Sequence, residues 1–490
     1  FALFSIKFPF RKHCGKHGYF SFIKTLGNTL EKCYNHNVFR LNHLARHHAR
    51  NKNKKRGFIM GFTMSLALVI FVATYALLLS FPKYRAYIAL ASAAVFIIVG
   101  IMPLKDILGS LDFNVLMMIA GTMGIVGLFI ESKMPALLAD IIIEKVPNVK
   151  WCIVALALFA SLISAFVDNV ATVLMVAPVA IDVAKKLRIS PVPIILSIAV
   201  ASNLQGAATL VGDTTSILLG GALDMTFLDF FWYENRPGLF FVVQFGAIAA
   251  SIVLLILFRN ERQRIAKGPR TLVTEYFPTY LLVGMIGLLI IASFINFNNA
   301  FVDSHKNGLI CMALLLLGML WKILKTKNFK GVVEVVKSID YFTLLLLAGL
   351  FIVIASISKA GVIDAIANLI GKIGSGNVFI IYTVIVWVSV LLSAFIDNIP
   401  YVLTMLPVIA TLSASLDPSS ATVLYFGLLV GSTLGGNLTP IGASANITGI
   451  GILRKEGYEV SFKQFTKIGI PFTLAAVITG YVLVWLLWGM

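Results

Sequence analysis

The sequence predicts an all-α polytopic membrane protein with about ten transmembrane elements. These elements are expected to form two inverted repeats, each containing a re-entrant helical hairpin and a broken helix. Hydrophobic residues make up 59% of the 490 residues and charged residues 13%, which is more apolar surface than a soluble domain can bury. Apolar runs long enough to cross a bilayer recur along the chain. The segment Ser-Ala-Phe-Val-Asp-Asn at 164–169 returns almost unchanged as Ser-Ala-Phe-Ile-Asp-Asn at 393–398.

Residues 1–59 differ from the rest of the chain. They contain 13 Lys or Arg and a single acid, Glu31, and so account for +12 of the net charge of +18. We expect this basic tail to be disordered, either as a cytosolic extension or as sequence upstream of a true start at Met60. The first repeat is then expected to occupy residues 60–270 and the second repeat residues 271–490.

Eight uninterrupted apolar runs are expected to be spanning helices. Two amphipathic pieces, Pro135 to Val146 and Gly361 to Ile373, are expected to lie in the membrane interface. In chain order the eight runs are Phe58 to Phe81, Ala86 to Leu104, Phe113 to Ile130, Gly238 to Phe258, Pro278 to Phe297, Gly308 to Leu324, Tyr341 to Ile357 and Ile468 to Trp488.

Four further apolar segments are interrupted. An Asp-Asn pair breaks Trp151 to Val183, and a second pair breaks Val378 to Leu412. Each break predicts a re-entrant hairpin, because a polar tip is tolerated at membrane depth only inside protein or beside a water-filled cavity. Ile194 to Leu223 and Ala421 to Leu453 are rich in Gly, Thr, Ser and Asn at their centres, and we expect these two spans to be unwound halfway across.

The breaks recur in the same order in both halves. An offset of 229 residues joins Asp168 to Asp397, and an offset of 230 joins Gly206 to Gly436. The basic loops 185–188, 259–270, 322–337 and 454–467 are expected to be cytoplasmic by the positive-inside rule. Tracing the chain from these loops makes the two hairpins enter the membrane from opposite sides, so the repeats are expected to be inverted. The membrane is expected to be the plasma membrane. Such repeats are typical of secondary transporters. The same trace places the basic tail outside, against its charge.

The hairpin tips supply the first candidate ion ligands: Asp168, Asn169, Asp397 and Asn398. A carboxylate at membrane depth requires a partner or a function. The two Asp residues can bind Na⁺ directly or exchange it for a proton, because burial favours the neutral acid, and the Asn side chains can offer a carbonyl oxygen. Alternatively, the Asp residues only cap the helices that follow them. Capping and ion binding can coexist.

The unwound spans supply the other candidates. Asp213 adds a third carboxylate, whose counterpart in the second repeat is Ala443, so the site cannot be fully symmetric. Glycines let the backbone approach a ligand closely, and unwound carbonyls suit Na⁺. The full set from these spans is Ser202, Asn203, Gly206, Thr209, Gly212, Asp213, Thr214, Gly436, Asn437, Thr439, Gly442, Ser444 and Asn446.

Three motifs resemble a known group of proteins. They are DNVATVL-x3-P at 168–178, ASN-x2-G-x2-TL-x-GD at 201–213 and GGNLTPIGASAN at 435–446. The chain is similar to the ion transporter superfamily, and within it to arsenite-efflux permeases, NhaD-type sodium/proton antiporters and the melanosomal P protein, whose domains are often labelled citrate-transporter-like. The resemblance runs from about Met60 to the C-terminus. It implies a homodimer of subunits with a scaffold and a transport domain that work as an elevator.

Two departures from the superfamily bear on the substrate. Carboxylate carriers of the superfamily have Ser-Asn-Thr at their hairpin tips, where this chain has Asp-Asn-Val and Asp-Asn-Ile. Two added negative charges would repel a dianion. The sequence Gly-Asp-Thr-Thr-Ser at 212–216 stands where the arsenite and P-protein groups typically have Gly-Asp-Pro-Pro-Asn. The resemblance is therefore specific for the superfamily and weak for the substrate.

These observations predict a secondary active transporter, not an enzyme, that moves a small ion coupled to H⁺ or Na⁺, by Na⁺/H⁺ antiport or arsenite-type efflux. No other cofactor and no nucleic-acid partner are expected; membrane lipid surrounds the protein. The alternative is a Na⁺-coupled carboxylate symporter of the citrate type. A distant alternative is an intramembrane aspartyl protease, but Leu210 stands where its Gly-x-Gly-Asp motif needs the first Gly. A channel is disfavoured, because oppositely inserted re-entrant elements fit alternating access better.

Overall fold

The computed structural model describes residues 61–265, 270–273, 275–295, 297–417 and 420–490. The basic tail 1–59 and the proposed start at Met60 lie outside the described residues. The architecture given below is that of the compact unit formed by residues 66–490, together with the helix Gly61–Ser80 that leads into it. This unit is almost entirely helical and confirms the predicted all-α polytopic fold. The described strands are β1 (Trp232–Tyr233) and β2 (Arg236–Pro237), a short antiparallel pair.

The elements follow the same order in both halves of the chain: two helices, a short connecting helix, a long helix, a helix that leads into the hairpin, the hairpin, a broken helix and a closing helix. In the first half they are Gly61–Ser80, η1 (Pro82–Tyr84), α2 (Arg85–Ile98), η2 (Leu104–Asp106), α3 (Ile107–Ser110), α4 (Phe113–Glu131), α5 (Met134–Lys145), α6 (Val149–Ser164), α7 (Asn169–Leu187), α8 (Val192–Gln205), α9 (Thr214–Ala222), η3 (Leu228–Phe230) and α10 (Leu239–Leu257). In the second half they are α11 (Phe277–Ala292), α12 (Ala300–Thr326), α13 (Lys330–Ser338), α14 (Tyr341–Lys359), α15 (Val362–Gly374), α16 (Val378–Ser393), α17 (Asn398–Ala414), α18 (Ala421–Gly435), η5 (Gly436–Leu438), α19 (Ser444–Lys455) and α20 (Phe462–Trp488).

Seven described helices are long and apolar enough to cross a bilayer alone, and the pair α15 and α16, bent by 117°, would make an eighth. The remaining apolar helices are shorter. Helix α6 has 16 residues and α8 has 14, whereas a full crossing needs about 20. Arms that reach only part of the way are what re-entrant hairpins and broken spans require.

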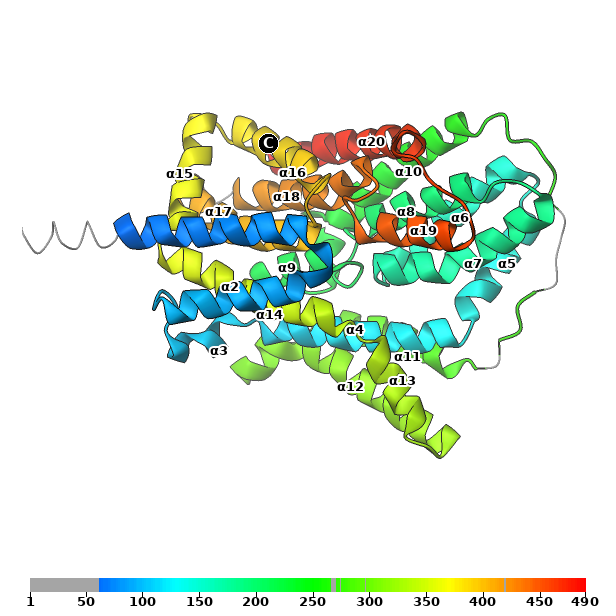
Figure 1. Ribbon diagram of the computed structural model, residues 1–490, viewed down its shortest axis with the longest axis horizontal. Coiled ribbons are helices and arrows are strands. Elements are labelled where there is room, and N and C mark those ends of the chain that lie inside the picture. The colour runs from blue at the N-terminus through cyan, green and yellow to red at the C-terminus, as the bar shows by residue number, and fades with distance from the viewer. Residues whose placement is uncertain (1–60, 266–269, 274, 296, 418–419) are drawn as a thin grey trace, which may run out of the picture. The chain divides into compact units, whose positions relative to one another are not determined.

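The two hairpins approach each other from opposite ends of the unit. Helices α6 and α7 lie at one end beside α5, and α16 and α17 lie at the other end beside α15 (Figure 1). The broken helices, α8 with α9 and α18 with α19, run between them. The tips of both hairpins therefore meet near the middle, where the inverted-repeat arrangement predicts the binding site.

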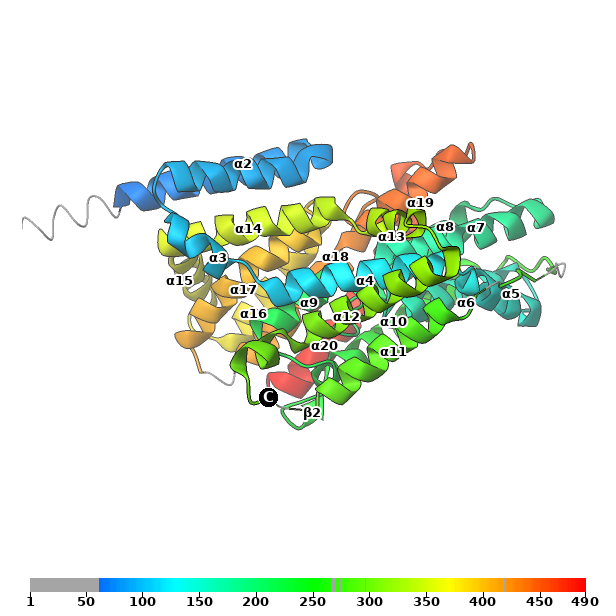
Figure 2. The same ribbon diagram turned by 90° about the horizontal axis from the view of Figure 1, so that it is seen from below.

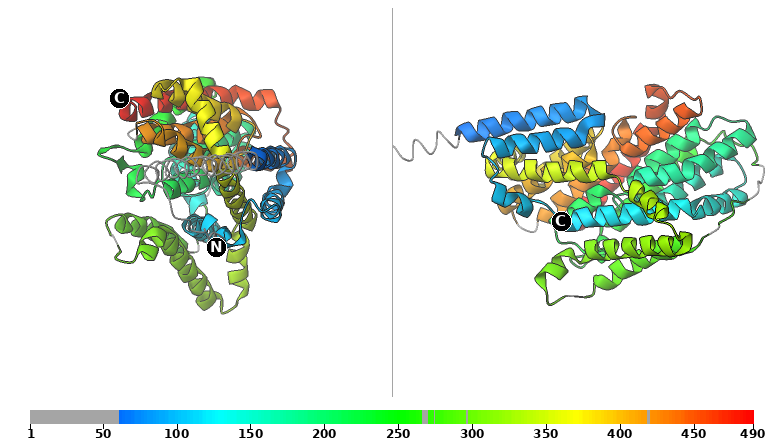
Figure 3. Two further views of the ribbon diagram at one scale, coloured as in Figure 1. Left: turned by 90° about the vertical axis from the view of Figure 1, so that its left-hand side faces the viewer. Right: turned by 60° about the horizontal axis from the view of Figure 1, so that its bottom comes forward.

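The long helices outside the hairpins pack in matched pairs. Helix α2 packs along α14 and α4 packs along α12 (Figure 2), while α11 lies beside α12 and α4 (Figure 3). Small residues allow these contacts, as is usual between helices in membranes. A Cβ on Gly121 of α4 would lie 2.6 Å from the backbone carbonyl carbon of Cys311, and a Cβ on Gly349 of α14 would lie 2.7 Å from that of Ala89.

Candidate ion and substrate site

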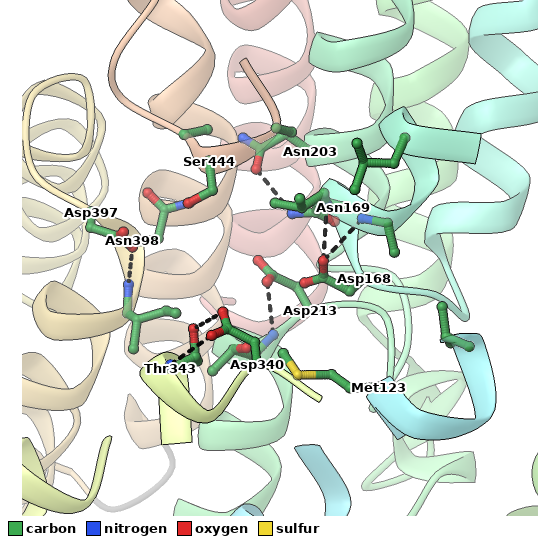
Figure 4. A pocket seen from close by; sticks show the side chains of 18 of the residues that line it. Met123, Asp168, Asn169, Asn203, Asp213, Asp340, Thr343, Asp397, Asn398 and Ser444 are labelled. Atoms are coloured by element: carbon green, nitrogen blue, oxygen red, sulfur yellow. Dashed lines mark hydrogen bonds between the residues drawn. The ribbon is translucent and has the colours of Figure 1, made fainter. Parts of the chain in front are cut away.

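A cavity of about 440 Å³ lies where the hairpin tips and the broken helices meet (Figure 4). Its polar lining comes from both halves of the chain. The sequence-predicted residues that line it are Asp168, Asn169, Asn203, Asp213, Thr214, Asp397, Asn398 and Ser444. The fold thus brings the four tip residues and four of the nine other polar candidates to one chamber.

Four aspartates around the cavity cap the helices that begin there. Asp168 precedes α7, Asp213 precedes α9, Asp340 precedes α14 and Asp397 precedes α17. Each side chain accepts hydrogen bonds from the first turn of its helix, which satisfies backbone N–H groups that the helix itself leaves open. The N–O distances are 3.0 and 3.2 Å to Asp168, 2.7 Å to Asp213, 3.0 and 3.2 Å to Asp340 and 3.2 Å to Asp397.

A fifth helix that begins at the cavity has no side-chain cap. Helix α19 starts at Ser444 after Ala443, and no side chain caps it. Ala443 occupies the place that Asp213 has in the first half. The predicted asymmetry is therefore present in the structure as one acidic helix start and one neutral helix start.

The four carboxylates have different surroundings. Asp168 uses only its Oδ2 for capping. Asp213 also accepts a bond of 3.0 Å from the Thr215 hydroxyl. Asp397 forms an ion pair with Arg85 of α2, and among the ion pairs of the described residues no other involves any of the four. The two hairpin tips are therefore not electrically equivalent.

In the first half, one side chain of the hairpin and one of the broken span hold the turn between α6 and α7. The Ser164 hydroxyl donates to Asn169 Oδ1 at 2.9 Å, and the Thr209 hydroxyl donates to the Ala165 carbonyl. A Cβ on Gly212 would lie 2.9 Å from that same carbonyl oxygen. The Gly at this position is required because the unwound backbone passes directly over the hairpin turn.

The second half repeats this construction. The Ser393 hydroxyl donates to Asn398 Oδ1, and the Thr439 hydroxyl donates to the Ala394 carbonyl. A Cβ on Gly442 would lie 2.7 Å from the Ala394 oxygen. The recurrence of Ser, Asn, Thr and Gly in the two sequence motifs thus reflects two copies of one tip.

A bridge of buried amides joins the two broken helices behind the cavity. Asn203 Nδ2 donates to the Thr433 carbonyl at 2.8 Å and to Asn437 Oδ1 at 3.2 Å. Asn437 Nδ2 donates to the Val200 carbonyl at 2.8 Å. Asn169 Nδ2 donates to Asn203 Oδ1 at 3.1 Å, which extends the bridge to the first hairpin tip. The first hairpin and both broken helices are in this way connected by side-chain hydrogen bonds, and the Ser393 hydroxyl, which donates to the Ser432 carbonyl, connects the second hairpin to α18.

The remaining candidates form a layer behind the lining. Ser202 donates to the Asn169 carbonyl at 3.0 Å, and Asn446 donates to the Gly436 carbonyl at 3.1 Å. The Gly206 carbonyl, left open by the break after α8, accepts from Ser216 at 2.9 Å. The candidates that do not line the cavity are Ser202, Gly206, Thr209, Gly212, Gly436, Asn437, Thr439, Gly442 and Asn446.

Several residues at the site were not among the sequence-predicted ligands. Asp340 and Thr343 line the cavity from the start of α14, and Met123 lines it from α4 (Figure 4). A signal for Asp340 exists, because it follows Asp112 by 228 residues and precedes an apolar run. Arg85 stands at the edge of a predicted span, where a basic residue is common, so nothing in its sequence position indicates its partner.

No group of three or more His, Cys, Asp or Glu side chains in the described part of the chain has an arrangement that could hold a metal ion.

Comparison with known proteins gives the family. The citrate transporter family model matches residues 66–431. The chain belongs to this family. An uncharacterized transporter of Mycobacterium tuberculosis is 33% identical over 431 residues, which cover 86% of this chain and 98% of that protein. The P protein of Sus scrofa is 27% identical over 497 residues, covering 85% of this chain and 58% of the P protein.

A solved structure supports the fold of this citrate transporter family member. The crystal structure of the Alcanivorax borkumensis YdaH transporter has a TM-score of 0.54 at 14% identity and covers 82% of this chain and 97% of that one. These matches confirm the resemblance to the ion transporter superfamily. The protein is an integral membrane transporter.

Proposed function

We propose that the protein is a secondary active transporter that moves a small ion by alternating access, with H⁺ or Na⁺ as the coupling ion. The observation that carries the proposal is the group of four helix-capping aspartates around one cavity. Among the described residues, only one of the four, Asp397, has an ion-pair partner, which is Arg85. A chamber with this charge attracts cations and repels an unaccompanied dicarboxylate. A cation or a proton is therefore the first ligand to seek.

The first-half carboxylates are the ones most available to a cation. Asp168 keeps its Oδ1 free of capping bonds, and Asp213 lies on the same cavity. Asn169 and Asn203 line the same cavity (Figure 4). A proton or Na⁺ bound here reduces the repulsion between the neighbouring carboxylates, and release of the ion restores it. This exchange supplies the coupling.

The movement is proposed to be of the elevator type. The Asn203 and Asn437 bridge connects the first hairpin to both broken helices, and bonds from Ser393 and Thr439 connect the second hairpin to α18 and its unwound segment. These elements can therefore move as one body against α2, α4, α12 and α14. We further propose a homodimer in the plasma membrane with loops 185–188, 259–270, 322–337 and 454–467 on the cytoplasmic side. Labelling single cysteines placed in these loops tests their cytoplasmic location, and cross-linking in native membranes tests the homodimer.

The alternative is Na⁺-coupled symport of a citrate-like carboxylate. A specific observation favours it: α19 begins at the cavity with Ser444 and without an acidic cap, and an uncapped helix start attracts an anion. The family name points the same way. In this alternative the coupling cations lie near Asp168 and Asp213, and the substrate carboxylate lies near Ser444.

The test is flux in proteoliposomes under an imposed pH gradient, comparing Na⁺, Li⁺, arsenite and citrate. Asp168→Asn and Asp213→Asn remove a charge but retain a capping oxygen, because Asn caps helices about as well as Asp. Both variants are expected to fold normally and to lose coupled flux. Asp229→Asn is the matched control, since Asp229 accepts a 2.6 Å bond from the Thr226 backbone N–H but does not line the cavity.

Wild-type coupled flux in both cavity variants would refute the proposal. Wild-type citrate uptake that depends on Na⁺, with no cation flux in the absence of citrate, would decide for the symport alternative.

A further inference from the structure

The second hairpin tip is held by a cation that belongs to the protein itself. Arg85 Nη1 of α2 pairs with Asp397 Oδ2, and both side chains are largely buried, with 15% and 14% of their surfaces exposed. One helix earlier, the Tyr75 hydroxyl donates to the Pro400 carbonyl at 2.6 Å in the first turn of α17. Arg85 and Tyr75 thus contact the second hairpin tip at two points. No corresponding ion pair reaches Asp168 among the described residues.

The internal repeat identifies the residue that matches Arg85. Gly121 of α4 packs on Cys311 of α12, and the equivalent Gly349 of α14 packs on Ala89 of α2. Arg85 lies four residues before Ala89, and Asn307 lies four residues before Cys311. Asn307 is buried on α12. One half of the protein therefore has a cation at this position, and the other half has a neutral amide.

The two halves also differ in how the broken helices meet the long helices. A Cβ on Gly221 at the end of α9 would lie 2.8 Å from Asp112 Oδ2, whereas a Cβ on the equivalent Gly451 of α19 would meet nothing within 4 Å. Asp340, the equivalent of Asp112, lines the cavity instead. The hairpins and broken helices are thus displaced toward one set of contacts, as expected of one end state of an inverted-repeat transporter.

In such transporters the opposite end state is reached when the two halves exchange their contacts. The exchange would bring Gly451 to Asp340 and would separate Gly221 from Asp112. It would also separate Asp397 from Arg85, because Asp397 would take the position that Asp168 has in this structure. Asp168 would then approach the matching position on α12, where the neutral Asn307 leaves its charge uncompensated.

We propose that Arg85 is a tethered cation that replaces the transported or coupling cation at Asp397 in this end state and withdraws in the other. The proposal rests on the cation-coupled transport proposed above. In the end state seen here, the guanidinium displaces the cation from Asp397 and so enforces its release on one side. In the opposite state Asp397 is open and takes up a cation on the other side. Arg85 therefore determines how many cations are exchanged in one cycle.

The test measures coupling stoichiometry from the reversal potential of flux in proteoliposomes. In Arg85→Gln the cation stays on Asp397 throughout the cycle, so we expect one coupling cation fewer per cycle than in the wild type. Asp397→Asn is expected to give the same stoichiometry, the double variant no further change, and Arg85→Lys the wild-type value. Lys359→Gln is the matched control, because it breaks an exposed ion pair with Asp106.

Each outcome bears on one proposal. A merely structural role of Arg85 would lower flux in Arg85→Gln without moving the reversal potential, and that result overturns the inference. A wild type without any cation coupling refutes the proposed function instead.

A second measurement covers the case in which Arg85→Gln does not fold. In a background without native cysteines, the pair Asp340→Cys and Gly451→Cys is expected to cross-link when the cation gradient drives turnover. The pair Asp112→Cys and Gly221→Cys should cross-link at rest. Absence of the first cross-link under every cation gradient would overturn the exchange of contacts on which the role of Arg85 depends.

Discussion

Gly442 is the position where a single added methyl group should disturb the site most. A Cβ there would lie 2.5 Å from the Gly436 carbonyl oxygen, 2.7 Å from that of Ala394 and 2.8 Å from that of Ser393. All three neighbours are backbone atoms, which cannot rotate away as a flexible side chain can. Forcing a methyl group into packed surroundings costs about 1–3 kcal/mol. Gly442→Ala should therefore separate the unwound segment from the second hairpin tip.

A control at an open helical glycine isolates this effect. A Cβ on Gly287 of α11 meets nothing within 4 Å, and in a helix Ala is favoured over Gly by up to about 1 kcal/mol. The two variants should consequently differ in stability by about 1–4 kcal/mol. Gly212→Ala should be intermediate, because its nearest oxygens lie at 2.8–3.0 Å.

The assay is thermal unfolding of the purified protein in detergent, followed by flux after reconstitution below the lowest transition. Gly442→Ala is expected to unfold at the lowest temperature and Gly212→Ala at a higher one. The wild type and Gly287→Ala are expected to be the most stable. Flux should fall in the first two variants and stay unchanged in Gly287→Ala. If Gly442→Ala is as stable and as active as Gly287→Ala, the close approach of the unwound segment to the hairpin turn is wrong.

Two further predictions concern the internal bridge and the open helix face. Asn203→Ala removes the Asn203 bonds to Asn437 Oδ1, the Thr433 carbonyl and Asn169 Nδ2, which should cost about 1–3 kcal/mol and lower the thermal transition. Asn203→Asp should not restore the transition, and an unchanged transition in Asn203→Ala would show that water replaces the amide. Gly451→Ala should leave thermal stability at the wild-type value but slow turnover. The reason is that the added methyl group meets Asp340 only in the opposite end state. Turnover at the wild-type rate would argue against that end state.

The hairpins and broken helices could be predicted from the sequence because their signal is local. An Asp-Asn pair inside an apolar run, as at Asp168 and Asp397, has few explanations at membrane depth. The second copy in the same order then made chance improbable. The structure accordingly begins α7 and α17 directly after these aspartates.

The sequence could not distinguish lining from support within the unwound spans. A helix has a period that assigns its faces, but an unwound segment has none, so Thr209 and Thr214 look equivalent in the sequence. In the structure Thr209 holds the hairpin turn from behind, whereas Thr214 lines the cavity. Arg85 was missed for a different reason: its partner lies 312 residues away and is determined by packing of α2 against the second half.

Helix capping by the tip aspartates does not compete with the proposed ion binding. Helix starts carry partial positive charge, and at least four of them meet at one cavity here, so acidic caps are compatible with the fold as well as with the proposed site. A carboxylate has two oxygens, and capping by Asp168 occupies only one of them. The same residue can therefore stabilise its helix permanently and bind a cation reversibly. The two roles differ in what they require, because capping needs an oxygen and cation exchange needs a charge. Asn supplies the first and not the second, so variants that keep stability and lose coupling would show both roles in one side chain.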